Sequence, residues 1–153
     1  MTTARMPGIA AVLPEVTGGV RQLYAAMYAT GVSPRLLELA HLRASQINAC
    51  SACVHAGVRS AREHGETDDR LHQVAAWRDS DLFDAAERAA LELTEAVTRL
   101  ADRPDPVDDD LWSRAAKHFT EPELAAVLLM IGVTNLFNRL NAPIRHPAGA
   151  GWT

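Results

Sequence analysis

Aromatic residues are scarce in this sequence: Phe, Trp and Tyr together make up 5% of its 153 residues. Short strands are usually rich in aromatic and β-branched residues, whereas closely packed helices can build a core from Leu, Val, Ile and Ala. No stretch shows the alternation of a half-buried strand, and no repeat of fixed period is visible. The composition therefore favours an all-α fold, and the length predicts a single domain over residues 1–153.

Lysine is almost absent, since Lys117 is the only one and the arginines are scattered. The formal net charge is −4 and the pI is about 5.8. Nucleic-acid binding depends on clustered Lys and Arg that meet the phosphates. The charge pattern thus argues against a nucleic-acid partner.

The sequence also lacks a secretory signal and a long apolar run. Residues 1–7 do not combine a charged segment with an apolar one. The longest uncharged run, 124–138, has about fifteen residues, too few to cross ~30 Å of hydrocarbon. We therefore expect a cytoplasmic protein without a membrane partner.

Cysteine is limited to two residues, Cys50 and Cys53. Because the cytoplasm keeps thiols reduced, such a pair is more often catalytic or metal-binding than a structural staple. Structural zinc needs four ligands, usually two spaced pairs, and the six histidines supply no second pair at ligand spacing. A catalytic pair and a buried, inert pair remain the main interpretations, and no metal site is expected.

Helical periodicity and capping residues predict about seven helices. The last one follows a capping-box pattern, Thr120 with Glu123, and is apolar nearly all round, which indicates a central helix or a subunit interface. Residues 1–15 and 143–153 are expected to be irregular ends. The expected helices span about 16–29, 34–46, 49–64, 67–77, 84–100, 108–119 and 121–140.

Cys50 and Cys53 lie at the start of the third expected helix, with Asn48 able to cap it. Residues three apart share a helix face, so the two thiols can form a disulfide with little backbone movement. The free amides and the macrodipole at this end favour a thiolate, and the same argument favours Cys50 as the more exposed thiol. A thiolate beside a second thiol is what peroxide reduction and disulfide exchange require.

The segment 38–53 reads Glu-Leu-Ala-His-Leu-Arg-Ala-Ser-Gln-Ile-Asn-Ala-Cys-Ser-Ala-Cys. It resembles the core motif of the AhpD-like, or carboxymuconolactone decarboxylase, superfamily, in which a glutamate precedes the first cysteine by twelve residues, as Glu38 does here. The arginine-bearing segment 59–62 also matches. The resemblance implies an AhpD-like helical bundle and an antioxidant thiol peroxidase or disulfide oxidoreductase, usually a trimer or hexamer, with no bound cofactor.

One position departs from the family pattern. The family has a histidine four residues after the second cysteine, which relays protons between the glutamate and the thiols, and Gly57 stands there. His41 follows Glu38 by three residues on the same helix face, so it is one candidate for the missing role. His55 is another, although it lies about 200° around the helix from Cys53.

The leading hypothesis is a thiol-dependent hydroperoxide reductase that uses the Cys50–Cys53 pair, with Glu38 as acid and base. Its substrate would be a hydroperoxide and its reductant an external dithiol of the lipoyl or thioredoxin type. One alternative is a redox-sensing or binding oligomer of the same fold that lost turnover with the histidine. Another is a lactone decarboxylase, but such members of the superfamily typically lack the cysteine pair.

Overall fold

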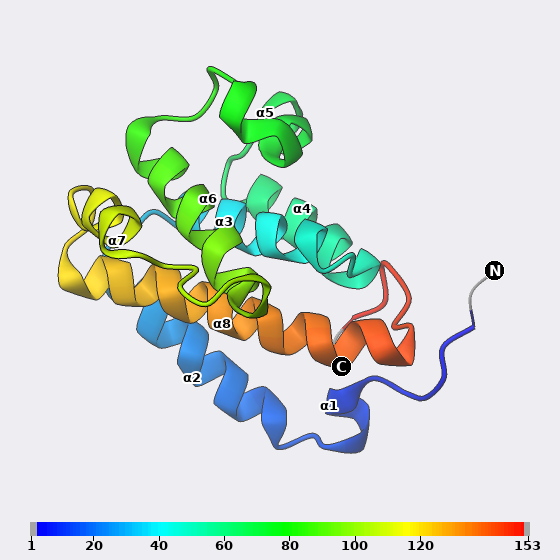
Figure 1. Ribbon diagram of the computed structural model, residues 1–153. Coiled ribbons are helices and arrows are strands. Elements are labelled where there is room, and N and C mark those ends of the chain that lie inside the picture. Colours follow the sequence, from blue (N-terminus) through cyan, green and yellow to red (C-terminus); the bar gives the residue numbers. More distant parts are fainter. Residues whose placement is uncertain (1–2, 152–153) are drawn as a thin grey trace.

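The computed structural model of the chain describes residues 3–151. Its regular secondary structure there consists of helices joined by loops, without a strand (Figure 1). The all-α prediction is confirmed, and the seven expected helices correspond to α2–α8. Two short 3₁₀ segments, Val74–Asp79 and Leu100–Asp102, follow α5 and α6. The eight helices are α1 Ile9–Val12, α2 Val16–Tyr28, α3 Pro34–Ile47, α4 Ser51–Glu63, α5 Asp68–Gln73, α6 Ala85–Thr98, α7 Asp109–Ala116 and α8 Glu121–Ile144.

Both ends of the chain differ from the expectation of irregular structure. The one-turn helix α1 lies within residues 1–15, so the cysteine helix is the fourth and not the third; four residues are too few to give a periodic signal. At the other end α8 continues through Pro143 to Ile144. A proline next to the last residue of a helix disturbs only the final turn, where no further residues have to follow it in the helix. The expected ends also include residues 1–2 and 152–153, which lie outside the described residues.

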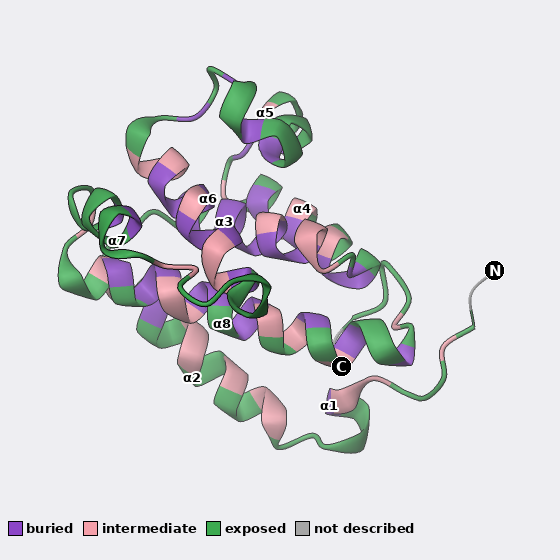
Figure 2. Cartoon of the chain, viewed as in Figure 1, coloured by how far each residue is buried: buried purple, intermediate pink, exposed green. Residues whose placement is uncertain are grey.

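The core is built around α3 and α8, which pack against each other. The helix α2 packs on α8, and α4 and α6 each contact both central helices (Figure 1). The helix α3 is largely buried, whereas α8 alternates buried residues with exposed ones along its length (Figure 2). Met27, Leu37 and Met130 come from three different helices and are fully buried in the larger apolar cluster. A second cluster, around Leu39 and Trp77, joins α3 to α4, α6 and the first 3₁₀ segment.

The long helix α8 begins as the sequence predicts. Thr120 and Glu123 form a capping box, in which each side chain accepts a hydrogen bond from the other residue's backbone N–H. By length and composition α8 would suffice to cross a membrane. It instead packs against α2, α3, α4 and α6, and Val127 and Ile131 are fully buried. An apolar helix in this position is the core helix of a soluble helical domain.

Candidate redox-active site

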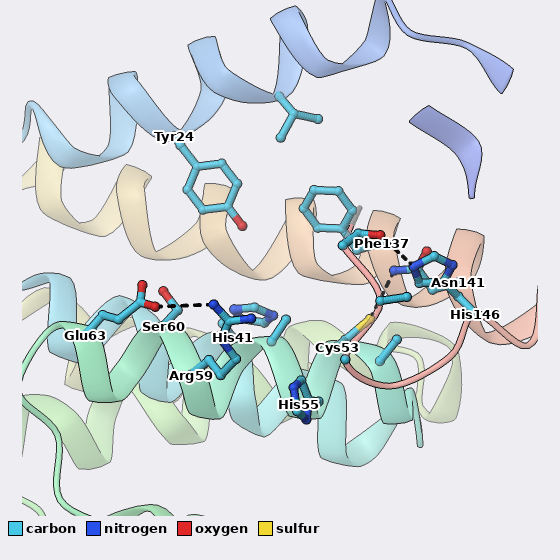
Figure 3. Close-up of a pocket in the computed structure, with 16 residues that line it drawn as sticks. Tyr24, His41, Cys53, His55, Arg59, Ser60, Glu63, Phe137, Asn141 and His146 are labelled. Atoms are coloured by element: carbon cyan, nitrogen blue, oxygen red, sulfur yellow. Dashed lines mark hydrogen bonds and ion pairs between the residues drawn. The ribbon is translucent and has the colours of Figure 1, made fainter. Parts of the chain in front are cut away.

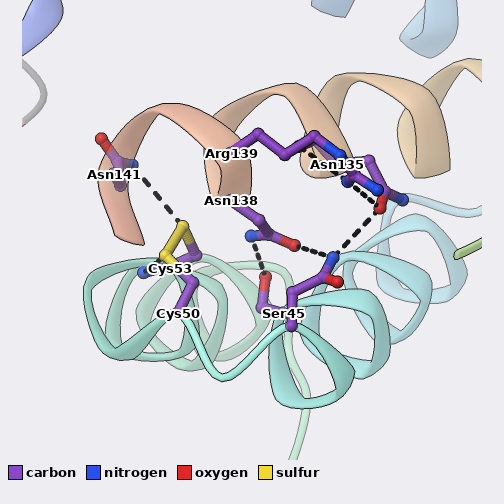
Figure 4. Close-up of a disulfide and its surroundings, with 8 residues drawn as sticks. Ser45, Cys50, Cys53, Asn135, Asn138, Arg139 and Asn141 are labelled. Atoms are coloured by element: carbon purple, nitrogen blue, oxygen red, sulfur yellow. Dashed lines mark hydrogen bonds between the residues drawn. A yellow bond between two sulfur atoms is a disulfide. The ribbon is translucent and has the colours of Figure 1, made fainter. Parts of the chain in front are cut away.

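The joint between α3 and α4 presents the first cysteine. The backbone turns at Ala49, which has a φ of 52° in the left-handed region, and the Cys50 N–H donates to the Ser45 carbonyl at 3.1 Å. Asn48 does not cap α4 as expected, because its amide donates to Asn135 and Asn138 of α8 at 3.0 and 2.8 Å (Figure 4). The joint is therefore tied to α8, and the cap position falls on Cys50.

Cys50 and Cys53 are joined by a disulfide, with their Cα atoms 5.3 Å apart. The Cys50 sulfur also accepts a hydrogen bond from the Cys53 backbone N–H at 3.4 Å. The expectation that Cys50 is the more exposed of the two is wrong: the exposed fractions are 1% for Cys50 and 3% for Cys53. The turn before α4 places the disulfide under α8, where the side chain of Phe137 packs on it.

A cavity of about 400 Å³ opens on the Cys53 side of the disulfide (Figure 3). Its walls come from α2, α3, α4, α8 and the segment after α8. Cys50 does not line this cavity but borders a second hollow of about 440 Å³ with Arg145 and His146. The Cys53 cavity is lined by Val20, Tyr24, His41, Ala52, Cys53, His55, Ala56, Arg59, Ser60, Glu63, Phe137, Asn141, His146 and residues 149–151.

Glu38 is buried below this cavity, with an exposed fraction of 1%. Its carboxylate accepts hydrogen bonds from the Ser60 hydroxyl at 2.7 Å and from the Tyr28 hydroxyl at 3.4 Å. The His41 Nδ1 atom lies 3.1 Å from the other carboxylate oxygen. A buried carboxylate needs such partners, and the three groups hold this one in place on α3.

His41 connects the buried glutamate to the cavity. Its ring lies against Gly57 of α4, so that a Cβ atom at Gly57 would be 3.6 Å from His41 Cε1 and 3.7 Å from each ring nitrogen. The same ring lines the cavity together with Cys53. The structure therefore places an imidazole from α3 beside the position where the family has its histidine.

His55 also lines the cavity, but at a different place. Its Nε2 atom lies 3.6 Å from where a Cβ of Gly149 would stand, beside the segment that follows α8. Among the described residues, no hydrogen bond joins His55 to Glu38 or to either cysteine. Of the two histidines named from the sequence, only His41 contacts Glu38.

Several residues near the site were not named from the sequence. Ser60 lies two helical turns after Cys53 on the same face of α4, so periodicity could have indicated it. Tyr28 and Asn141 come from α2 and α8, and no sequence pattern links them to the cysteines. Burial, followed by the charge of Glu38 and the hydrogen bond to it, raises the pKa of Tyr28 to about 12, so this hydroxyl stays protonated as a donor.

Burial and the charge of Glu38 likewise raise the pKa of Tyr24 above its usual value. The Tyr24 ring points into the cavity from α2 (Figure 3). The cavity therefore has a neutral phenol at one end and the disulfide at the other. Within residues 3–151, no group of three or more His, Cys, Asp or Glu side chains is arranged to hold a metal ion.

The chain matches the model of the carboxymuconolactone decarboxylase family over residues 14–96 and belongs to this family. It is 33% identical over 113 residues to the uncharacterized protein YdfG of Bacillus subtilis (strain 168), covering 74% of this chain and 76% of YdfG. It is 36% identical over 117 residues to the uncharacterized protein YnjA of Escherichia coli (strain K12), covering 76% of this chain and 63% of YnjA.

The fold is AhpD-like. A crystal structure of a protein of unknown function from Agrobacterium tumefaciens, ATU0492, proposed to be an antioxidant defence protein AhpD, superposes with a TM-score of 0.86. The two are 29% identical, and the match covers 97% of this chain and 100% of that one. The debrominase Bmp8 shares the fold with a TM-score of 0.78 at 19% identity, over 92% of this chain and 74% of its own. The fold thus carries enzymes of more than one kind.

Proposed function

We propose that this protein is a thiol-dependent hydroperoxide reductase in which Cys50 and Cys53 alternate between dithiol and disulfide. One observation carries the proposal: His41, held by the buried Glu38, lines the same cavity as Cys53. A base that is itself oriented by a carboxylate, next to a sulfur nucleophile, is the arrangement that activates thiols in enzymes. The likeness to a proposed antioxidant defence protein supports the same conclusion.

The Glu38–His41 pair moves the proton in this proposal. In this proposal the Nδ1 atom of His41, 3.1 Å from Glu38, carries the ring proton and donates to the carboxylate. Its Nε2 atom can then take a proton from the Cys53 thiol or give one to the leaving oxygen. His41 thereby performs from α3 the task that the family assigns to a histidine on the cysteine helix. Gly57 places no side chain in the space beside the His41 ring.

Cys53 is the sulfur that attacks the hydroperoxide, because it shares a cavity with His41 and Cys50 does not. Its thiolate displaces alkoxide from the terminal oxygen, which breaks the O–O bond, and the alkoxide takes a proton from His41 to become an alcohol. The Cys50 thiol then attacks the sulfenic acid on Cys53 to form the disulfide and water. One hydroperoxide becomes one alcohol and one water, and two thiols are oxidised.

An external dithiol of the lipoyl or thioredoxin type returns the protein to its reduced state. Cys50 is the sulfur that it attacks, since Cys50 borders the second hollow on the other side of the disulfide. The attack breaks the Cys50–Cys53 bond and releases Cys53 as a thiolate. The second thiol of the reductant then attacks the mixed disulfide, frees Cys50 and leaves as an oxidised disulfide.

Steady-state consumption of cumene hydroperoxide, with dihydrolipoamide or reduced thioredoxin as the electron donor, tests this function. We expect turnover by the native protein and none by Cys53→Ser or Cys50→Ser, with His72→Ala as a surface control that retains the native rate. A native protein that forms the disulfide reversibly but consumes no hydroperoxide would overturn the proposal. That result would favour the redox-sensing alternative.

A further inference from the structure

The side chain of Asn141 touches one of the two sulfurs. It extends from α8 to the start of α4, where its Nδ2 group donates a hydrogen bond to the Cys53 sulfur at 3.5 Å (Figure 4). Asn141 is 5% exposed, and it borders both the Cys53 cavity and the Cys50 hollow. The Asn141 amide is therefore a polar group of α8 in direct contact with one of the two redox-active sulfurs.

The rest of this amide makes no such contact. The Asn141 Oδ1 atom is buried and has no hydrogen-bond partner among the described residues. Burying an amide oxygen without a donor is unfavourable, and an apolar side chain of similar shape avoids that cost. Asn138, one turn earlier on α8, differs in this respect, because its amide donates to Ser45 and accepts from Asn48. The Asn138 amide is thus satisfied and stabilises the fold. Among the described residues, the side chain of Asn141 has one hydrogen bond, the one that it donates to the Cys53 sulfur.

We infer that Asn141 is a catalytic residue that stabilises the thiolate of Cys53. The inference rests on the redox role proposed above, in which Cys53 carries negative charge twice: when the reductant displaces it from the disulfide, and when it attacks the substrate. A hydrogen bond donated to the charged form favours that form and lowers the pKa of the thiol. Asn141 thereby makes Cys53 a better leaving group and more ionised near neutral pH.

Other charged or titratable groups also face the Cys53 cavity. His41 comes from α3, Tyr24 from α2, His146 from the segment after α8, and His55, Arg59 and Glu63 from α4 itself. The free amides at the start of α4 add a positive potential. Asn141 differs from all of these because its amide is neutral at every pH. Its effect on Cys53 is therefore a constant displacement of the thiol pKa, separable from the titration of the histidines.

The test measures the ionisation of Cys53 directly. Reduced native protein and Asn141→Leu are alkylated with iodoacetamide across a pH series, and the modification of each cysteine is followed by peptide mass spectrometry. We expect the pKa of Cys53 to rise by about one unit in Asn141→Leu, which corresponds to about tenfold less thiolate below that pKa. Asn141→Asp should raise it further, because an ionised carboxylate would then lie against the sulfur.

Asn138→Leu is the matched control on the same helix. It should lower the melting temperature and leave the Cys53 pKa unchanged, whereas Asn141→Leu should leave the melting temperature unchanged or raise it. An unchanged Cys53 pKa in folded Asn141→Leu would overturn the inference, and should that variant fail to fold, an unchanged pKa in Asn141→Asp would do so. Because no hydroperoxide is used, failure of the proposed peroxidase activity would be seen separately.

Discussion

The imidazole of His41 packs beside Gly57, so that a Cβ atom at position 57 would lie 3.6 Å from Cε1 of the ring, an ordinary van der Waals contact. A histidine on α3 and a glycine on α4 thus share one volume between two packed helices. The same ring contacts Glu38 through Nδ1 at 3.1 Å. A histidine at position 57 and a histidine at position 41 would compete for this volume, and the chain has only the second.

The first prediction follows from this competition. Gly57→His alone should not raise peroxidase activity, because the new ring would meet His41; overpacking of this kind costs about 1–3 kcal/mol. His41→Ala should lose activity, and the double variant His41→Ala/Gly57→His should recover at least part of it. Steady-state rates and melting curves of the three variants check this.

Gly57→Ala serves as the control for that series. Its added Cβ would make an ordinary contact with His41, and alanine is favoured over glycine inside a helix by about 1 kcal/mol. We therefore expect unchanged activity and a slightly higher melting temperature. A double variant no more active than His41→Ala would contradict the idea that the two positions are interchangeable.

Backbone strain at Ala49 gives a second prediction. Its φ of 52° lies in the left-handed region, which costs a residue with a Cβ roughly 1–2 kcal/mol. Ala49→Gly should relieve that cost, although glycine also adds entropy to the unfolded chain. The free energy of unfolding should therefore rise by about 0.5–1 kcal/mol. Urea unfolding measures it, and a loss of stability would contradict the interpretation.

Glu95 gives a prediction about acid stability. Burial alone would raise its pKa, but hydrogen bonds from Trp77, Arg78 and Arg43 hold the pKa below its usual value. A depressed carboxyl pKa stabilises the fold above the pKa of the unfolded chain, about 4.3, and this stabilisation is lost as the pH falls through the folded-state value.

Glu95→Gln should therefore lower the free energy of unfolding at neutral pH by roughly 2–3 kcal/mol. Between neutral and acid pH, the variant should lose less stability than the native protein. Glu92→Gln is the control, since Glu92 is a partly exposed partner of Arg114 and such pairs contribute up to about 1 kcal/mol. Equal acid dependence of native protein and Glu95→Gln, in urea unfolding at several pH values, would refute the assignment.

A further prediction concerns assembly, and we propose a homo-oligomer, trimer or hexamer. Leu136 on α8 is 43% exposed and Trp112 on α7 is 42% exposed, although large apolar side chains are favoured in interiors. Static light scattering at micromolar concentration should report a multiple of the 16.6 kDa chain mass. A particle with the mass of one chain would rule the assembly out.

Much of the fold could be predicted from the sequence because its signals are local. Helical periodicity gave α2–α8, and the pattern of Thr120 with Glu123 gave a capping box that is present. The helix α1 was missed because one turn carries no periodicity. Asn48 was wrongly expected to cap α4, since its bonds to α8 span 87 and 90 residues of sequence.

The site was predictable only in part, for the same reason. The motif spacing indicated Glu38 as a site residue, and the cysteine spacing indicated the pair. That the His41 ring fills the space at Gly57 depends on how closely α3 approaches α4. The contact of Asn141 with Cys53 joins residues 88 positions apart, and no sequence signal could have indicated it.

The most direct test of the central claim is the rate at which reduced protein is oxidised by cumene hydroperoxide in a single turnover. Rapid mixing and acid quench, followed by counting of the remaining thiols, would compare native protein with His41→Ala and with His55→Ala. A positioned acid–base group typically contributes ~10²–10⁴-fold, so we predict a loss of that size in His41→Ala and little change in His55→Ala. Equal rates in native protein and folded His41→Ala would contradict the account.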